Sequence, residues 1–194
     1  MGKAANSSIS LKQIHVTDNF WNKYVHLVKD VIIPYQWDIL NDKLEDVETS
    51  HCIENFKIAA GEKEGEFQGA VFQDTDVAKW LEAVGFVLNY ERDEKLEELA
   101  DETIELIGRA QQPDGYLNTY FTIKDPSKRW TNLKEGHELY TAGHMTEAAV
   151  AYYKATGKTE FLDIMKKFAD LICRTFGPEE GQNHGYPGHQ EIEL

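Results

Sequence analysis

A helical pattern that repeats at an offset of 65 residues constrains the fold of this chain more than any other feature. The matching positions are Glu82 and Glu147, Ala83 and Ala148, Leu96 and Phe161, Leu99 and Ile164, and Ile107 and Ile172. Each unit is a mostly apolar helix, then an amphipathic helix, then a turn-rich loop with a Gly-Tyr pair. Such hairpins cannot bury their apolar helices alone, so we predict an all-α fold of hairpins packed side by side.

The repeat also predicts how the chain is divided. A third unit begins at residues 188–194, where the sequence stops, so we expect residues 18–194 to form part of a larger helical toroid. Residues 1–17 form a separate N-terminal segment, and the alternation of apolar and polar residues at 9–16 predicts a short strand. Residues 116–121 are also rich in β-formers, so we expect short β-hairpin loops between the helical hairpins.

Composition excludes several classes of protein. A net charge of −14 argues against nucleic acid and anionic membranes as partners. No apolar run approaches the roughly 20 residues of a membrane span. Residues 1–10 contain no apolar signal region, so we expect a cytoplasmic protein. Cys52 and Cys173 lie in helical patterns and are interpreted as free thiols.

Polar residues gather where the apolar helices begin. Those groups are Asp74 and Asp76 in the first unit, His137 and Glu138 in the second, and His189, Gln190 and Glu191 in the third. Imidazoles and carboxylates at one rim, with Trp130, Tyr116, Tyr120 or Tyr186 beside them, suit recognition of a neutral polyol such as a sugar.

Simpler interpretations of these residues stay open. Asp74 or Asp76 is equally compatible with a helix N-cap, and Glu138 with a favourable first-turn charge. His144 lies two turns inside its helix and fits a core histidine. The fourth residue after His137 is Thr141, so the HExxH zinc motif is absent, and we expect no metal site within this chain.

Six blocks of the sequence stand out: PYQWDILND (34–42), HCIENFKIAAG (51–61), FQDTDVAKWLEA (72–83), QQPDGYLNTY (111–120), GHELYTAGHMTEAAVAYYKATGK (136–158) and GYPGHQEIEL (185–194). Together they closely resemble the start of glycoside hydrolase family 127, the β-L-arabinofuranosidase-type enzymes. The resemblance implies an (α/α)6 barrel followed by β-sandwich domains, and a retaining enzyme that removes terminal β-L-arabinofuranose. It also implies a cysteine nucleophile in a zinc site of cysteines and a glutamate, with a separate glutamate as general acid/base.

The resemblance places binding residues, but no catalytic ones, in this chain. His137 of HELY and His189 of GHQE match sugar-contacting histidines, with Gln36 and the Asp74–Asp76 turn as further wall residues. Neither cysteine lies in a matching motif, so zinc is expected only in a full-length relative. We therefore expect the substrate-binding half of a glycosidase, inactive alone, whose partners are a glycan, a second copy or the missing half.

Two alternatives remain from the sequence. One is a helical-repeat module that binds protein, which the long aromatic loops between hairpins disfavour. The other is a related toroid that acts on a different glycan.

Overall fold

The computed structural model describes residues 9–194, and every regular element in that range is a helix. The α-helices are α1 (Trp21–Leu27), α2 (Ile33–Leu40), α3 (Cys52–Ala59), α4 (Asp74–Tyr90), α5 (Glu94–Ala110), α6 (Thr119–Lys124), α7 (Glu138–Thr156) and α8 (Glu160–Thr175). Shorter turns are η1 (Leu11–Gln13), the π-turn η2 (Val28–Ile32), η3 (Pro126–Lys128) and η4 (Gln190–Glu193). The predicted all-α fold is confirmed.

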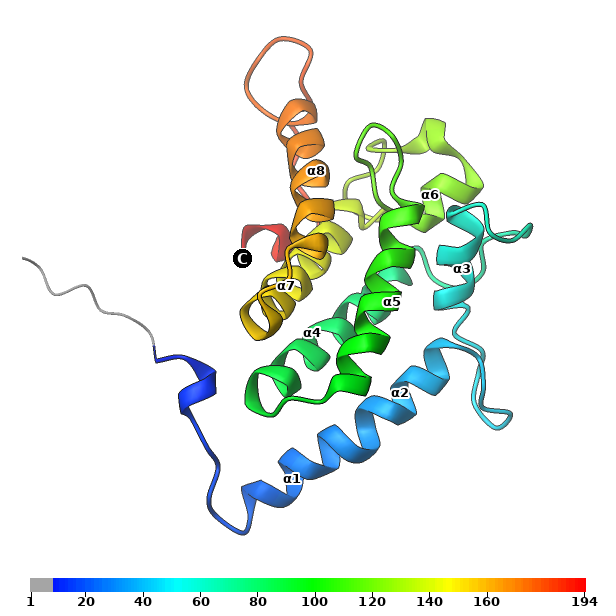
Figure 1. The fold of residues 1–194 in the computed structure, drawn as a ribbon. Coiled ribbons are helices and arrows are strands. Elements are labelled where there is room, and N and C mark those ends of the chain that lie inside the picture. Colours follow the sequence, from blue (N-terminus) through cyan, green and yellow to red (C-terminus); the bar gives the residue numbers. More distant parts are fainter. Residues whose placement is uncertain (1–8) are drawn as a thin grey trace, which may run out of the picture.

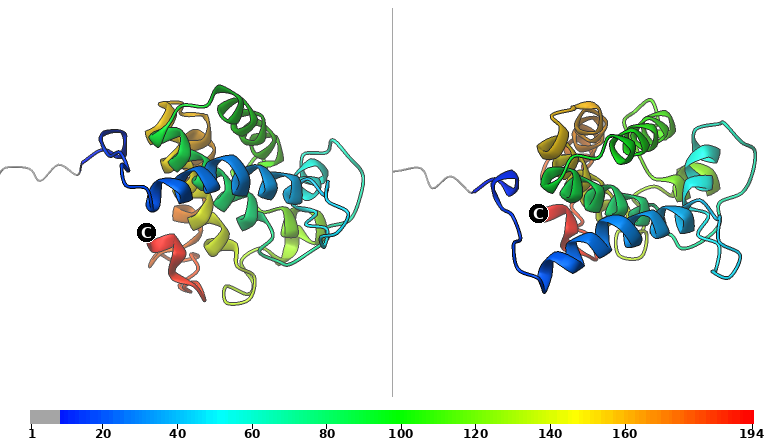
Figure 2. Two further views of the ribbon diagram at one scale, coloured as in Figure 1. Left: turned by 90° about the horizontal axis from the view of Figure 1, so that it is seen from below. Right: turned by 60° about the horizontal axis from the view of Figure 1, so that its bottom comes forward.

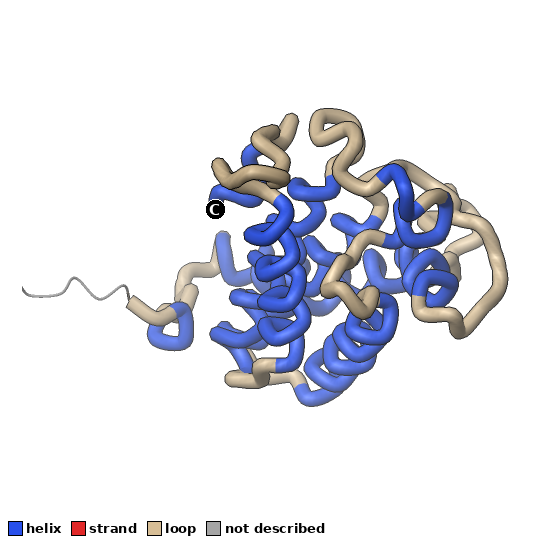
Figure 3. The backbone as a smooth tube through the Cα atoms, turned by 90° about the horizontal axis from the view of Figure 1, so that it is seen from above, coloured by secondary structure: helices blue, strands red, loops and turns tan. Residues whose placement is uncertain are grey.

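Two helical hairpins, α4–α5 and α7–α8, carry the repeat (Figure 1). Helices α4 and α7 pack along one another and contain more buried apolar residues than α5 and α8, which keep charged faces outward. Seen from above, the helices lie side by side, and long loops run along one end and one side of the bundle (Figure 3). The predicted order of an inner, apolar helix followed by an outer, amphipathic one is therefore confirmed.

Gly85 allows α4 and α7 to approach closely. A Cβ atom at this position would lie 2.9 Å from the carbonyl carbon of Ala151 and 2.9 Å from the nitrogen of Tyr152. Both of these atoms are backbone, so they cannot move aside as a side chain can. The space between the two helices thus requires a residue without a side chain.

We expect Gly85→Ala to lower the free energy of unfolding by about 1–3 kcal/mol, because the helices must separate to admit the methyl group. Gly108→Ala on α5 is the matched control, since its Cβ would meet only the flexible end of Ile164 at 3.1 Å. Its expected change is below about 1 kcal/mol, with helix propensity favouring alanine. Urea denaturation of both variants measures the difference, and equal effects would contradict the backbone contact.

Helix α1, the π-turn η2 and α2 form one continuous rod that crosses α4 (Figure 2). The helix does not end at Pro34 but continues through α2 to Leu40. Proline lacks the N–H that an α-helical turn requires, and the wider turn at Val28–Ile32 precedes it and lets the helix continue. The indole nitrogen of Trp80 donates to the carbonyl of Ile33 at 3.1 Å and fixes the rod against α4.

No extended strand occurs in residues 9–194, where strand-like pairing is limited to an isolated bridge between Phe176 and Asn183. The predicted strand at 9–16 is wrong: Ser10 caps the short turn η1 instead, and no neighbouring strand offers pairing partners. The predicted β-hairpin loop at 116–121 is also wrong, because Asn118 accepts a hydrogen bond from Phe121 N and starts α6.

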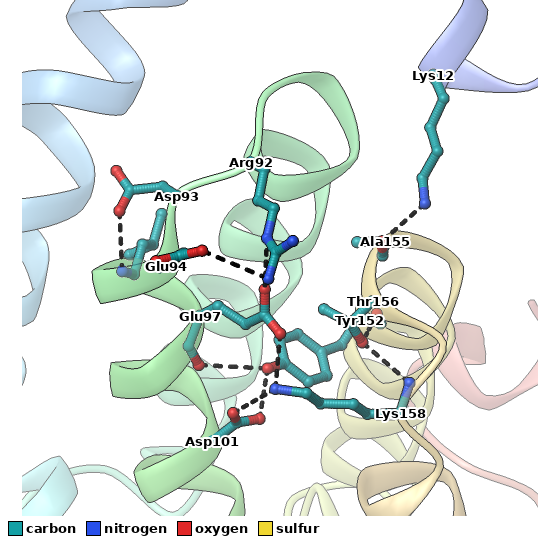
Figure 4. A network of polar contacts seen from close by, with 11 residues as sticks. Lys12, Arg92, Asp93, Glu94, Glu97, Asp101, Tyr152, Ala155, Thr156 and Lys158 are labelled. Carbon is teal, nitrogen blue, oxygen red and sulfur yellow. Dashed lines mark hydrogen bonds and ion pairs between the residues drawn. The ribbon is translucent and has the colours of Figure 1, made fainter.

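A polar network fastens the outer helix α5 to the end of α7 (Figure 4). The hydroxyl of Tyr152 donates to Asp101 at 2.6 Å, and the ammonium of Lys158 contacts Asp101 at 2.5 Å and Glu97 at 2.7 Å. The carboxylate of Asp101 on the first hairpin thus holds two groups of the second.

Within residues 9–194, no helix has both the length and the apolar content that crossing a membrane requires.

Candidate functional site

His137 and His189 lie together at the rim where α7 and η4 begin. Their ring centroids are 4.9 Å apart, although 52 positions separate them in the sequence. Tyr140 packs against both imidazoles, at 5.6 Å from His137 and 5.3 Å from His189, and Phe72 flanks His137 at 5.1 Å. The predicted convergence of the two histidines is therefore present in the structure.

The proton of the His137 ring can be placed from its contacts. His137 has a left-handed backbone with φ of 54°, and its Nδ1 lies 2.7 Å from the carbonyl oxygen of Glu135. A carbonyl oxygen only accepts, so Nδ1 carries the hydrogen. In the neutral ring Nε2 is then left as an acceptor, which suits the hydroxyl group of a ligand.

Lys79 connects this histidine pair to the start of α4. Its ammonium lies 3.4 Å from the hydroxyl of Tyr140 and 3.3 Å from Thr75 Oγ1. Burial raises the pKa of Asp76, one turn before Lys79, while the Lys79 charge acts in the opposite direction. The rim therefore combines an ammonium donor, a carboxylate acceptor and two imidazoles.

Gln36 and Asp76 line one cavity of about 370 Å³ between the α1–α2 rod and α4. The other lining residues are Ile39, Leu40, Ser50, Lys79, Trp80 and Ala83. A cavity with an apolar wall, one aromatic ring and a few polar groups is typical of a small-molecule site. Two of the predicted binding residues, from different helices, are thus brought to the same hollow.

Asp74 and Glu138, in contrast, point into the protein. Asp74 is 2% exposed, and its two oxygens accept from Thr119 N at 2.7 Å and Thr119 Oγ1 at 2.5 Å. Burial raises its pKa to about 6, against the opposing effect of those hydrogen bonds. Asp74 is therefore neither an N-cap nor a rim group: it ties α4 to α6.

Glu138 has the corresponding role at the start of α7. It is 1% exposed and accepts from the Tyr116 hydroxyl at 2.5 Å and from Trp130 N at 2.8 Å. Burial raises its pKa to about 7. The assignment of Glu138 to substrate binding is corrected to a structural role, in which it anchors Trp130 with its left-handed φ of 62°.

The aromatic residues predicted around the rim differ in exposure: Tyr116 is buried, Tyr120 and Trp130 are partly buried, and Tyr186 is 82% exposed. Tyr116 has no exposed surface, so it cannot stack on a ligand. The Trp130 ring packs on Tyr116, Phe168 and Phe176, with centroids 5.3, 6.2 and 5.3 Å away. The partly buried Trp130 thus packs against the aromatic core, and these contacts do not themselves support its proposed contact with substrate.

Three residues beside the histidines were missed from the sequence: Phe72, Lys79 and Tyr140. The spacing contained a signal for two of them. Tyr140 lies three positions after His137, and Lys79 lies three positions after Asp76, so each shares a helix face with a predicted residue. Phe72 lies before α4 in a loop, where no periodicity places it.

The cysteines do not fit the zinc site that the resemblance implies. Cys52 is fully buried, its thiol donates to the carbonyl of Gln73 at 3.2 Å, and burial raises its pKa well above the usual value. Cys173 is exposed on α8. Neither thiol belongs to a group of potential metal ligands among the described residues.

Comparison with known proteins gives a family match over most of the chain. The family model described as the β-L-arabinofuranosidase GH127 catalytic domain matches residues 13–194. The chain belongs to family GH127. Its helical hairpins are therefore part of a GH127 catalytic domain.

Several relatives of this GH127 chain are known. A non-reducing-end β-L-arabinofuranosidase from Bifidobacterium longum is 43% identical over 93% of the chain. Among solved structures, a GH127 β-L-arabinofuranosidase from Geobacillus stearothermophilus T6 is 64% identical over 92% of the chain, with a TM-score of 0.91. Another GH127 β-arabinofuranosidase is 36% identical over 95%, with a TM-score of 0.87. The chain spans 30%, 28% and 30% of these relatives, respectively.

Proposed function

We propose that this chain is the substrate-binding part of a retaining glycoside hydrolase that removes terminal β-L-arabinofuranose or a related sugar from glycans. The observation that carries the proposal is the pairing of His137 and His189, 4.9 Å apart, beside a hollow with further polar groups. Support also comes from the β-L-arabinofuranosidase names of its relatives.

The rim offers what a furanose requires. A sugar hydroxyl both donates and accepts, so it pairs well with an imidazole acceptor such as Nε2 of His137. Lys79 supplies a donor, while Asp76 and Gln36 supply an acceptor and an amide in the adjacent cavity. Tyr140 and Phe72 fix the ring of His137 from two sides, so these groups are preorganised rather than ordered on binding.

The contribution of this chain to the reaction is orientation. Holding the sugar ring in one position means that its loss of translational and rotational entropy occurs on binding. Less of that cost then remains in the activation barrier for the groups that act on the glycosidic bond. We assign no nucleophile here, because a thiolate must be ionised near neutral pH and the environment of Cys52 opposes ionisation. Any cysteine nucleophile, its zinc ion and the acid/base glutamate belong to the remainder of a GH127 enzyme.

We expect His137→Asn and His189→Ala each to weaken binding of methyl β-L-arabinofuranoside by about tenfold, the effect of losing one good hydrogen bond. Asparagine suits position 137 because it tolerates the left-handed backbone there. Titration followed by NMR of the imidazole resonances measures the affinity.

His26→Ala on α1 is the control, because its side chain is 55% exposed and lies outside the rim cluster. Its affinity should equal that of the unmodified chain. Sugar binding that survives loss of both His137 and His189 would contradict the proposed site. Hydrolysis of an aryl β-L-arabinofuranoside by residues 1–194 alone would contradict the absence of catalytic groups. Preference for an α-linked or uronate glycoside would favour the other-glycan alternative.

A further inference from the structure

His144, Glu147 and Glu191 form a compact cluster just below the rim. His144 and Glu147 lie on α7, and Glu191 comes from η4. One ligand atom from each residue lies within 4.8 Å of the others. The imidazole Nδ1 is 3.0 Å from a Glu191 oxygen and 3.9 Å from a Glu147 oxygen. These three side chains are 12%, 32% and 18% exposed, so the cluster is largely shielded from water.

The imidazole of His144 is not satisfied by the protein. Both of its ring nitrogens are inaccessible to solvent, and neither has a hydrogen-bond partner among the described residues. The Glu191 oxygen lies close to Nδ1, but its position does not meet the geometry of a hydrogen bond. Burial and the charge of Lys79 lower the pKa of His144, which favours the neutral ring that metals bind.

The two carboxylates also need a positive partner. Burial raises the pKa of Glu147, and the hydrogen bond and charge of Glu191 raise it further. Burial, and then the charge of Glu147, likewise raise the pKa of Glu82 on α4. A bound cation would offset the repulsion between these neighbouring carboxylates. The positive charge of Lys79 would repel such a cation, although its ammonium is hydrogen-bonded to Thr75 and Tyr140.

The backbone holds the third ligand in place before any ion arrives. A Cβ at Gly143 would lie 2.6 Å from the carbonyl carbon of Glu191, so η4 packs directly on the surface of α7. This contact fixes Glu191 opposite His144, one helix position from Gly143. Preformed donors on rigid elements lose little freedom on binding.

We propose that His144, Glu147 and Glu191 bind a divalent first-row transition-metal ion. One imidazole and two carboxylates are ligands that zinc, manganese and iron accept, and water would complete the coordination. Neither cysteine takes part. Because Glu191 is two residues after His189, the ion would fasten to α7 the segment that carries this histidine. The inference does not depend on which sugar the rim binds.

Isothermal titration of the chelator-treated chain with Zn²⁺ tests the proposal. We expect about one equivalent of Zn²⁺ to bind. His144→Ala and Glu147→Gln should each weaken binding by more than about tenfold. His26→Ala is the matched control, because His26 forms an exposed pair with Asp30 at 3.7 Å.

A second measurement does not rely on the folding of the variants. Cobalt(II) added to the unmodified chain should perturb the imidazole resonances of His144 and leave those of His26 unchanged. Absence of Zn²⁺ binding overturns the proposal. So does perturbation confined to His137 and His189, which would place the ion at the sugar site. Failure of either experiment leaves the sugar-binding proposal standing, because that proposal is tested by methyl β-L-arabinofuranoside binding.

Discussion

Glu138→Ala is expected to lower the free energy of unfolding by about 4 kcal/mol. The change removes the acceptor of the Tyr116 hydroxyl and of Trp130 N, and leaves two buried donors without partners at about 1–3 kcal/mol each. A cavity next to fully buried Tyr116 adds to the loss. Urea denaturation near pH 5 measures the effect best, because the carboxyl is then protonated and its removal relieves no buried charge.

Glu135→Ala is the control for this substitution. Glu135 lies three residues earlier, its side chain is 64% exposed, and it pairs only with Lys134 at the surface. Its expected change is within about 0.5 kcal/mol. A loss below about 1 kcal/mol for Glu138→Ala would show that Tyr116 and Trp130 find other partners, and would return Glu138 to the candidate rim residues.

The repeat in the sequence correctly predicted the two helical hairpins, α4–α5 and α7–α8. Apolar spacing identified α4 and α7 as inner helices and α5 and α8 as outer ones, because burial of a helix face depends on residues along that helix. The same repeat brought His137 and His189 to one rim, since equivalent positions in stacked hairpins lie at the same end.

Loop partners could not be predicted in this way. Asp74 is held by Thr119, and Glu138 by Tyr116 and Trp130, and all three partners lie outside the inner helices. A carboxylate at the first turn of a helix has the same sequence pattern whether it faces solvent or a loop. Asp74 and Glu138 therefore have structural roles because of the paths of the loops that carry their partners. The spacing of residues along a helix does not determine those paths.

The unmodified chain is expected to lose stability as pH rises from about 4 to about 8, through Asp74 and Glu138. Their pKa values in the folded chain, about 6 and about 7, exceed the ordinary values of 3.8 and 4.5. Over this interval the folded chain binds more protons than the unfolded chain, so the free energy of unfolding falls with pH. An ordinary aspartate is already more than half ionised at pH 4, so only part of the Asp74 shift acts within this interval. At about 1.4 kcal/mol per pKa unit, the loss from pH 4 to pH 8 is then about 2 kcal/mol for Asp74 and about 3 kcal/mol for Glu138.

Asp74→Asn isolates the first of these contributions, because asparagine keeps one acceptor for Thr119 but does not titrate. The difference in unfolding free energy between the unmodified chain and this variant should shrink by about 2 kcal/mol from about pH 4 to about pH 8. His144 acts in the opposite direction, since its lowered pKa favours folding at higher pH, but it is common to both proteins and cancels in the difference. A difference that stays constant with pH would mean that Asp74 ionises in the folded chain as it does in the unfolded one. Its carboxylate would then have access to water, and the buried tie between α4 and α6 would be wrong.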